Sequence, residues 1–304
     1  MFLEARIAQT VTEAEAAGLT RELYGLAVSA RALPGEYDDN FQLTTSDGHA
    51  FVLKVMHPAR ERSFIDLQCQ ALLHLAKQAP NLSLPRVVPA RGGELFTSVI
   101  AADGSTRLVW LLTFVEGTVL ADVCPHSPEL LGSLGGFLGE MDSALQSFSH
   151  PAAHRDLKWD SSRAGWIKDY LLHVTDPKRR ALVEKFLALY DLEVVPVMPQ
   201  LRRSVIYGDA NDHNVLVSDP WPQPRKVVSL IDFGDIHHGL TVSELAIAAA
   251  YAILGKKEPL QAAAASVSGY HRAWPLEEKE LSVLYALISV RLAVVSPIPR
   301  IAKP

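Results

Sequence analysis

The residue pattern changes near Gly117, and this change constrains the fold more than any other feature of the sequence. Before Gly117, short apolar runs alternate with turn residues, a pattern typical of β-strands. After it, apolar residues recur at helical spacing over long stretches. A chain of 304 residues, 48% hydrophobic and 21% charged, can bury a large core. We therefore expect two lobes, residues 1–115 and 116–304.

The N-terminal lobe is expected to hold a small sheet and one helix. Alternating runs flank the turn dipeptide Asp47-Gly48, and two further runs flank Asp103-Gly104-Ser105, so each pair predicts a hairpin. Residues 61–79 switch to the spacing of a helix that Pro80 and Pro85 close. The expected strands are 26–28, 41–44, 51–55, 95–101 and 108–114.

The C-terminal lobe is expected to be mostly helical. Short apolar strands and polar loops interrupt the helical pattern only between residues 204 and 231. The expected helices are 127–148, 162–174, 178–192, 241–254, 258–273 and 277–294.

A polar loop between two apolar strands carries the most specific chemical signal. Gly208 permits a tight bend after one strand, and Asp209 to Asn214 fill the loop before the next. A second acidic turn begins at Asp232, directly after the apolar run 229–231. A carboxylate can accept a hydroxyl proton, and carboxylate and amide oxygens bind Mg2+ beside nucleotide phosphates. Alone, Asp209 and Asn214 could merely satisfy loop backbone groups, but with Asp232 they favour phosphoryl transfer.

Lys54 is the candidate phosphate contact of the N-terminal lobe. It lies within the apolar run 51–55, where a lysine is ordinarily a solvated side chain on one face of a strand. The turn-rich segment 34–40 precedes it and could fold over nucleotide phosphates while Lys54 pairs with their charge. Gln68, on the predicted helix, could accept a hydrogen bond from Lys54 without neutralising it, or could simply lie on the helix surface.

These motifs resemble those of the aminoglycoside phosphotransferase and choline kinase-like small-molecule kinases, over nearly the whole chain. Segments 37–41, 52–55 and above all 208–214 are most similar to the hydroxylysine kinases and their bacterial relatives. The resemblance implies an α+β, protein-kinase-like two-lobe fold with a nucleotide-binding first lobe. It also implies Mg2+-dependent transfer of the γ-phosphate of ATP or GTP to a hydroxyl of an amine-bearing metabolite, with hydroxylysine the best candidate.

The resemblance also assigns roles to individual residues. It makes Asp209 the catalytic base, Asn214 and Asp232 the Mg2+ ligands, and Lys54 the contact to the α and β phosphates. The other nucleotide-side residues that it implies are Gly35, Tyr37, Gln68, Thr113, Phe114 and Val115, the last three through backbone contacts to the purine. Two departures from the family pattern are Tyr207, where histidine is common, and Gln68, which replaces the usual helix acid.

Acidic and aromatic side chains near the loop are candidates for contacts to the acceptor. Asp235 and Glu244 could pair with a substrate ammonium group, and Trp166 could wall a cation pocket with Trp159 and Tyr170. The ordinary alternatives are a helix-dipole partner for Glu244 and core packing for the aromatic residues.

Two other functions remain open from the sequence. An aminoglycoside kinase, or a kinase of another amino alcohol such as choline, ethanolamine or homoserine, would share every catalytic residue. A nucleotide-binding pseudokinase module that regulates a partner usually lacks the base, a metal ligand or the lysine, whereas this chain has all of them.

Composition restricts partners and location. The net charge of −5 and a pI near 6.1 predict no basic face for nucleic acid. No apolar run reaches signal-peptide or membrane-span length, so we expect no membrane association and a cytoplasmic location. Cys69 and Cys124 form no Cys-x-x-Cys pair and are expected to be buried. The resemblance further implies a fusion or functional link to a pyridoxal-phosphate enzyme.

Overall fold

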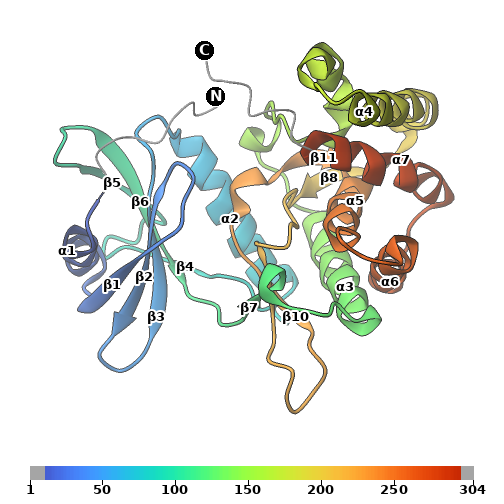
Figure 1. The fold of residues 1–304 in the computed structure, drawn as a ribbon. Helices are drawn as coiled ribbons and strands as arrows, with labels where there is room; N and C mark the ends of the chain where they lie inside the picture. Colours follow the sequence, from blue (N-terminus) through green and yellow to red (C-terminus); the bar gives the residue numbers. More distant parts are fainter. Residues whose placement is uncertain (1–10, 296–304) are drawn as a thin grey trace. The chain divides into compact units, whose positions relative to one another are not determined.

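The computed structural model describes residues 11–295, which divide into two compact units. The first unit takes in the chain up to Lys77 together with Ser83–Glu116, and the second takes in Gln78–Leu82 and the residues from Gly117 on. The first unit carries one six-stranded sheet, whereas the second carries two small sheets and most of the helices (Figure 1). The mixed α/β architecture confirms the predicted fold class.

The six-stranded sheet of the first unit is antiparallel throughout. Its strand order is β1-β2-β3-β6-β4, and β5 pairs with β6. Both predicted hairpins are confirmed, and Gly48 in the first turn has φ of 88°. The first strand begins two residues later than predicted and runs on to Leu33. The strands are β1 (Val28–Leu33), β2 (Asp39–Thr45), β3 (Ala50–Val55), β4 (Val87–Val88), β5 (Thr97–Ile100) and β6 (Thr106–Thr113).

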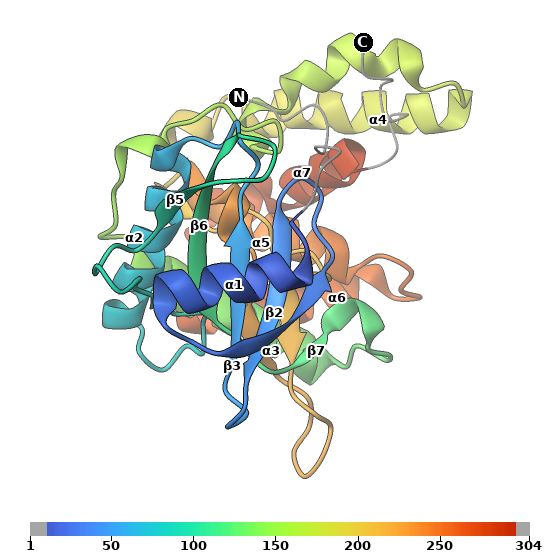
Figure 2. The same cartoon turned by 90° about the vertical axis from the view of Figure 1, so that its left-hand side faces the viewer.

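Two helices cover the faces of this sheet. Helix α1 (Glu13–Tyr24), which the sequence analysis missed, begins at a capping box in which Thr12 and Glu15 bond to each other's backbone N–H. It lies across one face of the sheet and packs on a buried apolar cluster that includes Phe41 and Leu53 (Figure 2). Helix α2 (Arg62–Gln78) covers the opposite face (Figure 1) and confirms the predicted helix.

The second unit combines short strands with long helices. Strands β7 (Thr118–Val119), β9 (Val215–Val217) and β10 (Val227–Leu230) form one sheet, and β8 (Arg203–Ile206) pairs with β11 (His237–Leu240). Most predicted helices are present. They are α3 (Pro128–Leu145), α4 (Pro177–Leu189), α5 (Thr241–Ala252), α6 (Pro259–Ala273) and α7 (Glu278–Val295).

The helix predicted at 162–174 is present, but as a 3-10 helix and not as an α-helix. Residues Ser161–His173 form a run of 3-10 turns with a kink at Arg163. Asp160 caps the first turn by accepting a hydrogen bond from Ser162 N–H, and Gly165 weakens the helical preference of the middle. The segment is therefore wound differently from the longer helices around it.

Helix packing in the second unit depends on glycine. A Cβ on Gly269 of α6 would lie 1.9 Å from the carbonyl oxygen of Gly132 of α3, and one on Gly135 would lie 1.8 Å from Ser266 O. The two helix backbones therefore touch at these positions, which no larger residue allows. Helix α5 is enclosed on all sides, since every residue from Thr241 to Ala250 is buried.

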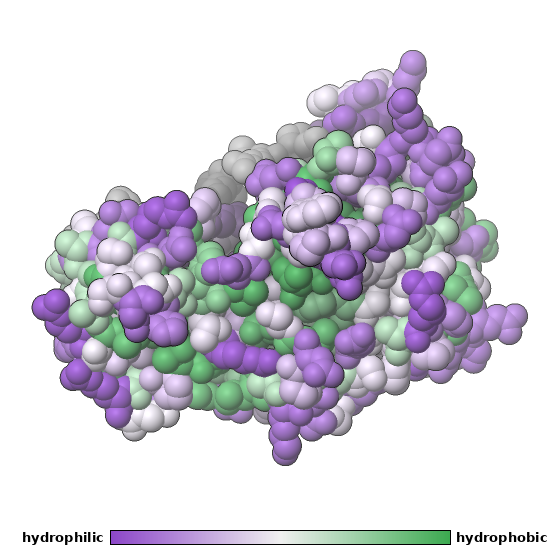
Figure 3. All heavy atoms as spheres, turned by 90° about the horizontal axis from the view of Figure 1, so that it is seen from below, coloured by the Kyte–Doolittle hydropathy of each residue, from purple (hydrophilic) through white to green (hydrophobic). Residues whose placement is uncertain are grey.

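One of the two cysteines predicted to be buried is exposed. Cys69 is buried in α2 as expected, but Cys124 is exposed, because it lies in the loop that follows the short 3-10 turn Leu120–Asp122. On the face seen in Figure 3, hydrophilic side chains cover the protruding parts, and hydrophobic side chains also reach the surface. Within residues 11–295, none of the helices is long and apolar enough to span a membrane.

Candidate active site

The predicted polar loop joins β8 to β9 and is fastened at both ends. Gly208 has φ of 81°, and a Cβ there would lie 2.8 Å from Asp235 O, so the position requires glycine. Its N–H donates to Glu244 Oε2 at 2.8 Å. At the other end, Ile231 N–H donates to Asn214 O at 3.0 Å. The loop backbone is thereby tied to both α5 and the acidic turn.

Asp209 is held in the loop by an amide and a guanidinium. Asn214 Nδ2 donates to Asp209 Oδ2 at 2.7 Å, and Arg291 Nη2 lies 3.6 Å from Oδ1. Burial, and then the charge of Asp235, raise the pKa of Asp209 to about 7, although Asn211 and Arg291 act in the opposite direction. A carboxylate with a pKa near neutrality suits the transfer of a proton from a hydroxyl at physiological pH.

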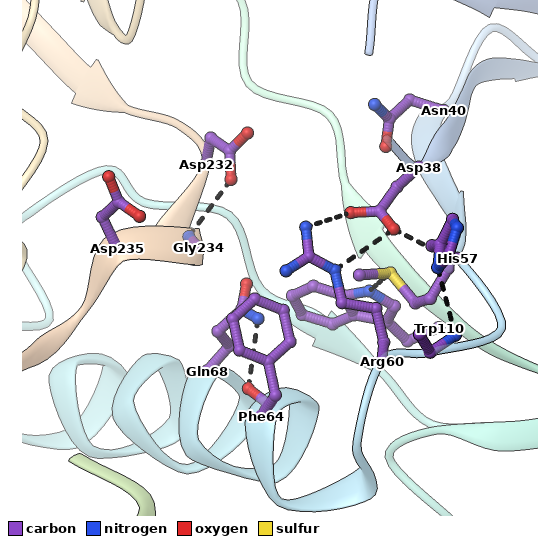
Figure 4. Close-up of polar contacts among 12 residues, drawn as sticks. Asp38, Asn40, His57, Arg60, Phe64, Gln68, Trp110, Asp232, Gly234 and Asp235 are labelled. Carbon is purple, nitrogen blue, oxygen red and sulfur yellow. Dashed lines mark hydrogen bonds and ion pairs between the residues drawn. The ribbon is translucent and has the colours of Figure 1, made fainter. Parts of the chain in front are cut away.

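Asp232 opens the acidic turn in an unusual backbone conformation. Its φ of 60° makes it the one non-glycine residue with positive φ among residues 11–295. Its Oδ1 accepts a hydrogen bond from Gly234 N–H at 3.1 Å (Figure 4), which supports the left-handed conformation that Asp tolerates better than most residues. Such a backbone is often found where function dictates the direction of a side chain.

Asn214 and Asp232 offer a divalent metal the donors that it prefers. Asn214 turns its Nδ2 toward Asp209, which leaves Oδ1 as the amide's ligand atom, and Asp232 is an exposed carboxylate. No group of three His, Cys, Asp or Glu side chains among the described residues could hold a metal by itself. Mg2+ in kinases is commonly bound by one or two carboxylates together with substrate phosphates, so the two residues fit a site that nucleotide completes.

Tyr207 packs the loop against the acidic turn. Its hydroxyl donates to Ile231 O at 2.5 Å, and its ring meets Phe233 edge-on with centroids 5.0 Å apart. The ring is fully buried, and burial raises the pKa of the hydroxyl well above its ordinary value. The departure from histidine therefore affects packing, since the phenol stays protonated.

Glu244 is a support for the loop, and its burial argues against the predicted contact to the acceptor. The side chain is fully buried in α5, and its Oε2 accepts from Gly208 N–H. Burial raises the pKa of Glu244 to about 7, while the backbone N–H groups of Gly208 and Tyr207 lower it. The sequence pattern of an acid in a first helical turn did not reveal this role, because it depends on which element packs behind the loop.

Asp235 lies beside the candidate catalytic loop but has an internal partner. Arg155 Nη2 donates to Gly234 O at 2.5 Å and lies 3.9 Å from Asp235 Oδ1. Asp235 is partly exposed, with 27% of its side chain accessible. Its role toward an acceptor ammonium group stays a prediction.

The predicted aromatic cation pocket is occupied by a lysine of the chain itself. The Lys158 Nζ lies 4.6 Å from the ring centroid of Trp166, 5.7 Å from that of Trp159 and 6.0 Å from that of Tyr170. Trp166 also donates from Nε1 to Lys158 O at 3.0 Å. The three rings do form a cation site, but in this structure the cation is Lys158.

Arg291 is a candidate functional residue that the sequence analysis missed. It comes from α7, and its side chain is only 3% exposed although it is charged. A single arginine inside the apolar run 286–295 was the available signal, because a buried guanidinium needs a partner. That partner, Asp209, is more than eighty residues away in the sequence and becomes visible only in the fold.

Lys54, the candidate phosphate contact of the first unit, lies on the sheet face that α2 covers. Asn40, Lys54 and Trp110 are directly opposite one another on β2, β3 and β6, so their side chains share that face. The Lys54 Nζ lies 5.9 Å from the centroid of the Trp110 ring. Gln68 is buried in α2 and donates from Nε2 to Phe64 O at 3.1 Å (Figure 4), which leaves its oxygen as the atom able to accept from Lys54.

The loop between β1 and β2 is folded around Asp38. Its Oδ1 accepts from His57 N–H at 2.7 Å, and its Oδ2 pairs with Arg60 Nη2 at 3.0 Å (Figure 4). A Cβ on Gly35 would lie 2.3 Å from Asp38 O, so the loop closes on itself there. The loop that contains Gly35 and Tyr37 is therefore linked to the segment between β3 and α2.

The candidate purine contacts at the end of β6 are partly used by the sheet. Thr113 N–H donates to Arg86 O at 2.9 Å, and Phe114 N–H donates to Ala50 O at 3.0 Å. The Thr113 hydroxyl also accepts from Arg86 N–H. The donors of Thr113 and Phe114 are thus engaged, which favours Val115 for a backbone N–H contact to a base.

Residues 29–279 match the family model described as the phosphotransferase enzyme family. The chain is 30% identical to a hydroxylysine kinase of Danio rerio over 92% of this chain and 81% of that protein. It is 28% identical to a hydroxylysine kinase of Bos taurus over 92% of this chain and 79% of that protein. Among solved structures, a microcompartment-associated aminopropanol kinase has a TM-score of 0.73 at 20% identity, over 91% of this chain and 86% of that one.

These matches define the class of protein. The chain belongs to the phosphotransferase enzyme family, because the family model covers most of its length. Like the relatives, it is a small-molecule kinase that phosphorylates a hydroxyl group. The resemblance inferred from the sequence is thereby confirmed.

Proposed function

We propose that the protein transfers the γ-phosphate of ATP or GTP to the hydroxyl of hydroxylysine, with Mg2+ as the metal. The observation that carries the reaction type is the Asp209 carboxylate, oriented in its loop by Asn214 Nδ2 and by the nearby Arg291 guanidinium. The choice of acceptor rests on the hydroxylysine kinases, which are 27–30% identical over 92–93% of this chain.

The chain's own residues suffice for the proton-transfer and positioning steps. Asp209 accepts the proton of the acceptor hydroxyl while the oxygen of that hydroxyl forms a bond to the γ-phosphorus. The bond between that phosphorus and the bridging oxygen of the donor breaks, and the nucleoside diphosphate leaves with the electron pair. Metal bound through Asn214 and Asp232 would supply neutralisation of the phosphate charge.

We assign the nucleotide to residues 1–115 and the acceptor to residues 116–304. Lys54 would pair with the α and β phosphates, the loop that holds Gly35 and Tyr37 would cover them, and Val115 would contact the base. Gln68 would orient Lys54 through its amide oxygen. Asp235 would receive an ammonium group of the acceptor.

The test is a comparison of acceptors under one set of conditions. Purified protein with Mg2+ and ATP, and separately GTP, is assayed for nucleoside diphosphate release with hydroxylysine, choline, ethanolamine, homoserine and kanamycin. We expect the highest kcat/KM with hydroxylysine and none without divalent metal. A clear preference for another acceptor would replace hydroxylysine, and no acceptor-dependent release at all would contradict the proposal.

An amino alcohol is the second candidate acceptor. The structural similarity to the aminopropanol kinase, and to an amicoumacin kinase with a TM-score of 0.69 at 15% identity over 94% of this chain and 85% of that one, shows the shared fold and keeps this candidate open. The cytoplasmic location and the link to a pyridoxal-phosphate enzyme stay predictions from the sequence.

A further inference from the structure

Arg291 joins three parts of the second unit around the candidate base. Its Nη1 donates to Trp159 O at 3.3 Å, and its Nη2 lies 3.6 Å from Asp209 Oδ1. Its guanidinium carbon is 5.9 Å from the ring centroid of Trp159 and 5.8 Å from that of Tyr251. The cation is therefore placed within reach of whatever group lies next to Asp209.

The guanidinium is not fully satisfied within the described part of the chain. Arg291 is 97% buried, and its Nε has no hydrogen-bond partner there. The 3.6 Å separation from Asp209 is an ion-pair distance and too long for a hydrogen bond. A buried N–H without an acceptor is costly, so native structures normally supply one.

The Nε is itself sealed from solvent, so an oxygen of the substrate would approach the guanidinium at Nη2, which faces Asp209. Arginine presents parallel N–H groups whose spacing matches a carboxylate, and such bidentate pairs are among the strongest hydrogen bonds in proteins. The Asp209 side chain beside it is 23% exposed, so the guanidinium adjoins an accessible group. We propose that Arg291 binds the carboxylate of the acceptor, which makes the protein a kinase of hydroxy amino acids in preference to amino alcohols.

This inference rests on the proposed function and deepens it. A hydroxyl at Asp209 and a carboxylate at Arg291 lie a few carbons apart on one small molecule, as in hydroxylysine. Choline, ethanolamine and the aminoglycosides present no carboxylate, so they would leave the Arg291 guanidinium without this partner. Arg291 would then act as a filter on the acceptor, while Asp209 performs the proton transfer.

The test uses two acceptors that differ only in the carboxylate. Hydroxylysine and its decarboxylated analogue, 1,5-diaminopentan-2-ol, are compared by kcat/KM in the wild type, Arg291→Met and Arg291→Lys. The ratio between the two acceptors is the readout, because loss of the Arg291 charge also affects Asp209 and slows both reactions. A purely structural role would lower both rates and leave the ratio unchanged.

We expect the wild type to favour hydroxylysine by about 10- to 100-fold, the range of a hydrogen-bonded charge pair. Arg291→Met should bring the ratio close to one, with Arg291→Lys in between. A wild type that uses both acceptors equally overturns the inference and leaves the kinase assignment standing. A ratio that stays at the wild-type value in Arg291→Met, or in Arg291→Lys if Arg291→Met does not fold, overturns the inference as well. A wild type that phosphorylates neither acceptor overturns the proposed function itself.

Discussion

The candidate residues around Asp209 and those around Lys54 are held in place in different ways. In the second unit, the loop is fastened by hydrogen bonds to buried groups, among them the fully buried Glu244, which accepts from Gly208 N–H. In the first unit, Lys54 is a half-buried residue on a sheet face, and the neighbouring loop is tied down by Asp38 and its partners Arg60 and His57. The catalytic group is thus built into a core, whereas the nucleotide loop is anchored near the surface.

This difference has a functional meaning. Proton transfer demands a base held within narrow limits, because a misplacement of about 1 Å can cost about 100-fold in rate. Nucleotide phosphates are bound by charge and backbone, and a loop with few anchors can adjust to them. Mutations around Asp209 should therefore lower activity or stability strongly, and mutations in the nucleotide loop should have smaller effects.

Asp209→Asn should have the largest effect. Asparagine keeps the shape but cannot accept a proton as a base, so kcat should fall about 10²–10⁴-fold, the usual contribution of such a group. Nucleotide binding, measured by calorimetry with a non-hydrolysable analogue, should be nearly unchanged. A variant that keeps more than a tenth of the wild-type kcat would exclude Asp209 as the base.

Gly269→Ala should destabilise the second unit. The new methyl would lie 1.9 Å from Gly132 O, so α3 and α6 must separate, at a cost of about 1–3 kcal/mol or more. Gly18→Ala in the exposed part of α1 is the matched control, because no atom lies within 4 Å of its Cβ. Gly18→Ala should raise the free energy of unfolding by about 0.4–1 kcal/mol. Urea unfolding of both variants measures this difference in the free energy of unfolding, and equal effects of the two substitutions would contradict it.

Glu244→Ala should cost about 1–3 kcal/mol, because Gly208 N–H loses its buried acceptor, whereas Glu244→Gln keeps an oxygen there. The pKa of Glu244 is raised from 4.5 to about 7 in the folded state. The folded protein then holds a proton that the unfolded chain releases, so stability falls as the pH rises from about 4.5 to about 7. Asp142 and Asp209 contribute with the same sign, since their pKa values are also raised.

Thermal unfolding across pH 5 to 8 tests this sign. Glu244→Gln should show a shallower decline of stability with pH than the wild type does. If the stability of Glu244→Gln declines with pH as steeply as that of the wild type, or if the stability of the wild type rises with pH, Glu244 is ionised in the folded protein.

Asp38→Asn should have the smallest effect. Loss of the charge pair with Arg60 should raise the KM for nucleotide about three- to ten-fold with little change in kcat, since such partly exposed pairs contribute about 1 kcal/mol. Asp47→Asn, on the exposed turn between β2 and β3, is the matched control and should leave the KM unchanged. A loss in kcat larger than that in KM would mean that Asp38 acts on the reaction step.

Much of the architecture could be predicted because it depends on local patterns. The Asp47-Gly48 turn, the periodic helices and the polar loop between strands are encoded by neighbouring residues. Helix α1 was not predicted, although Thr12 and Glu15 form a capping signal at its start. The helix at Ser161–His173 was predicted, but not its 3-10 geometry, because helical spacing does not separate 3-10 turns from an α-helix.

The site was predictable only where residues are close in sequence. Asp209, Asn214 and Asp232 follow short apolar strands and are recognisable by spacing alone. Arg291 and Glu244 reach the loop from α7 and α5, so their roles depend on tertiary packing. Which cation lies against the rings of Trp159, Trp166 and Tyr170 was equally unpredictable, because the path of the chain brings Lys158 to them.

Phosphorus NMR of the reaction mixture tests the central claim most directly. Wild-type protein is incubated with Mg2+, ATP and hydroxylysine, and the phosphorus spectrum is recorded with proton coupling. The account predicts a new phosphomonoester signal split by the proton on the hydroxyl-bearing carbon, formed in equal amount with ADP and absent with Asp209→Asn. Release of inorganic phosphate alone, or a phosphoryl group on nitrogen, would contradict it.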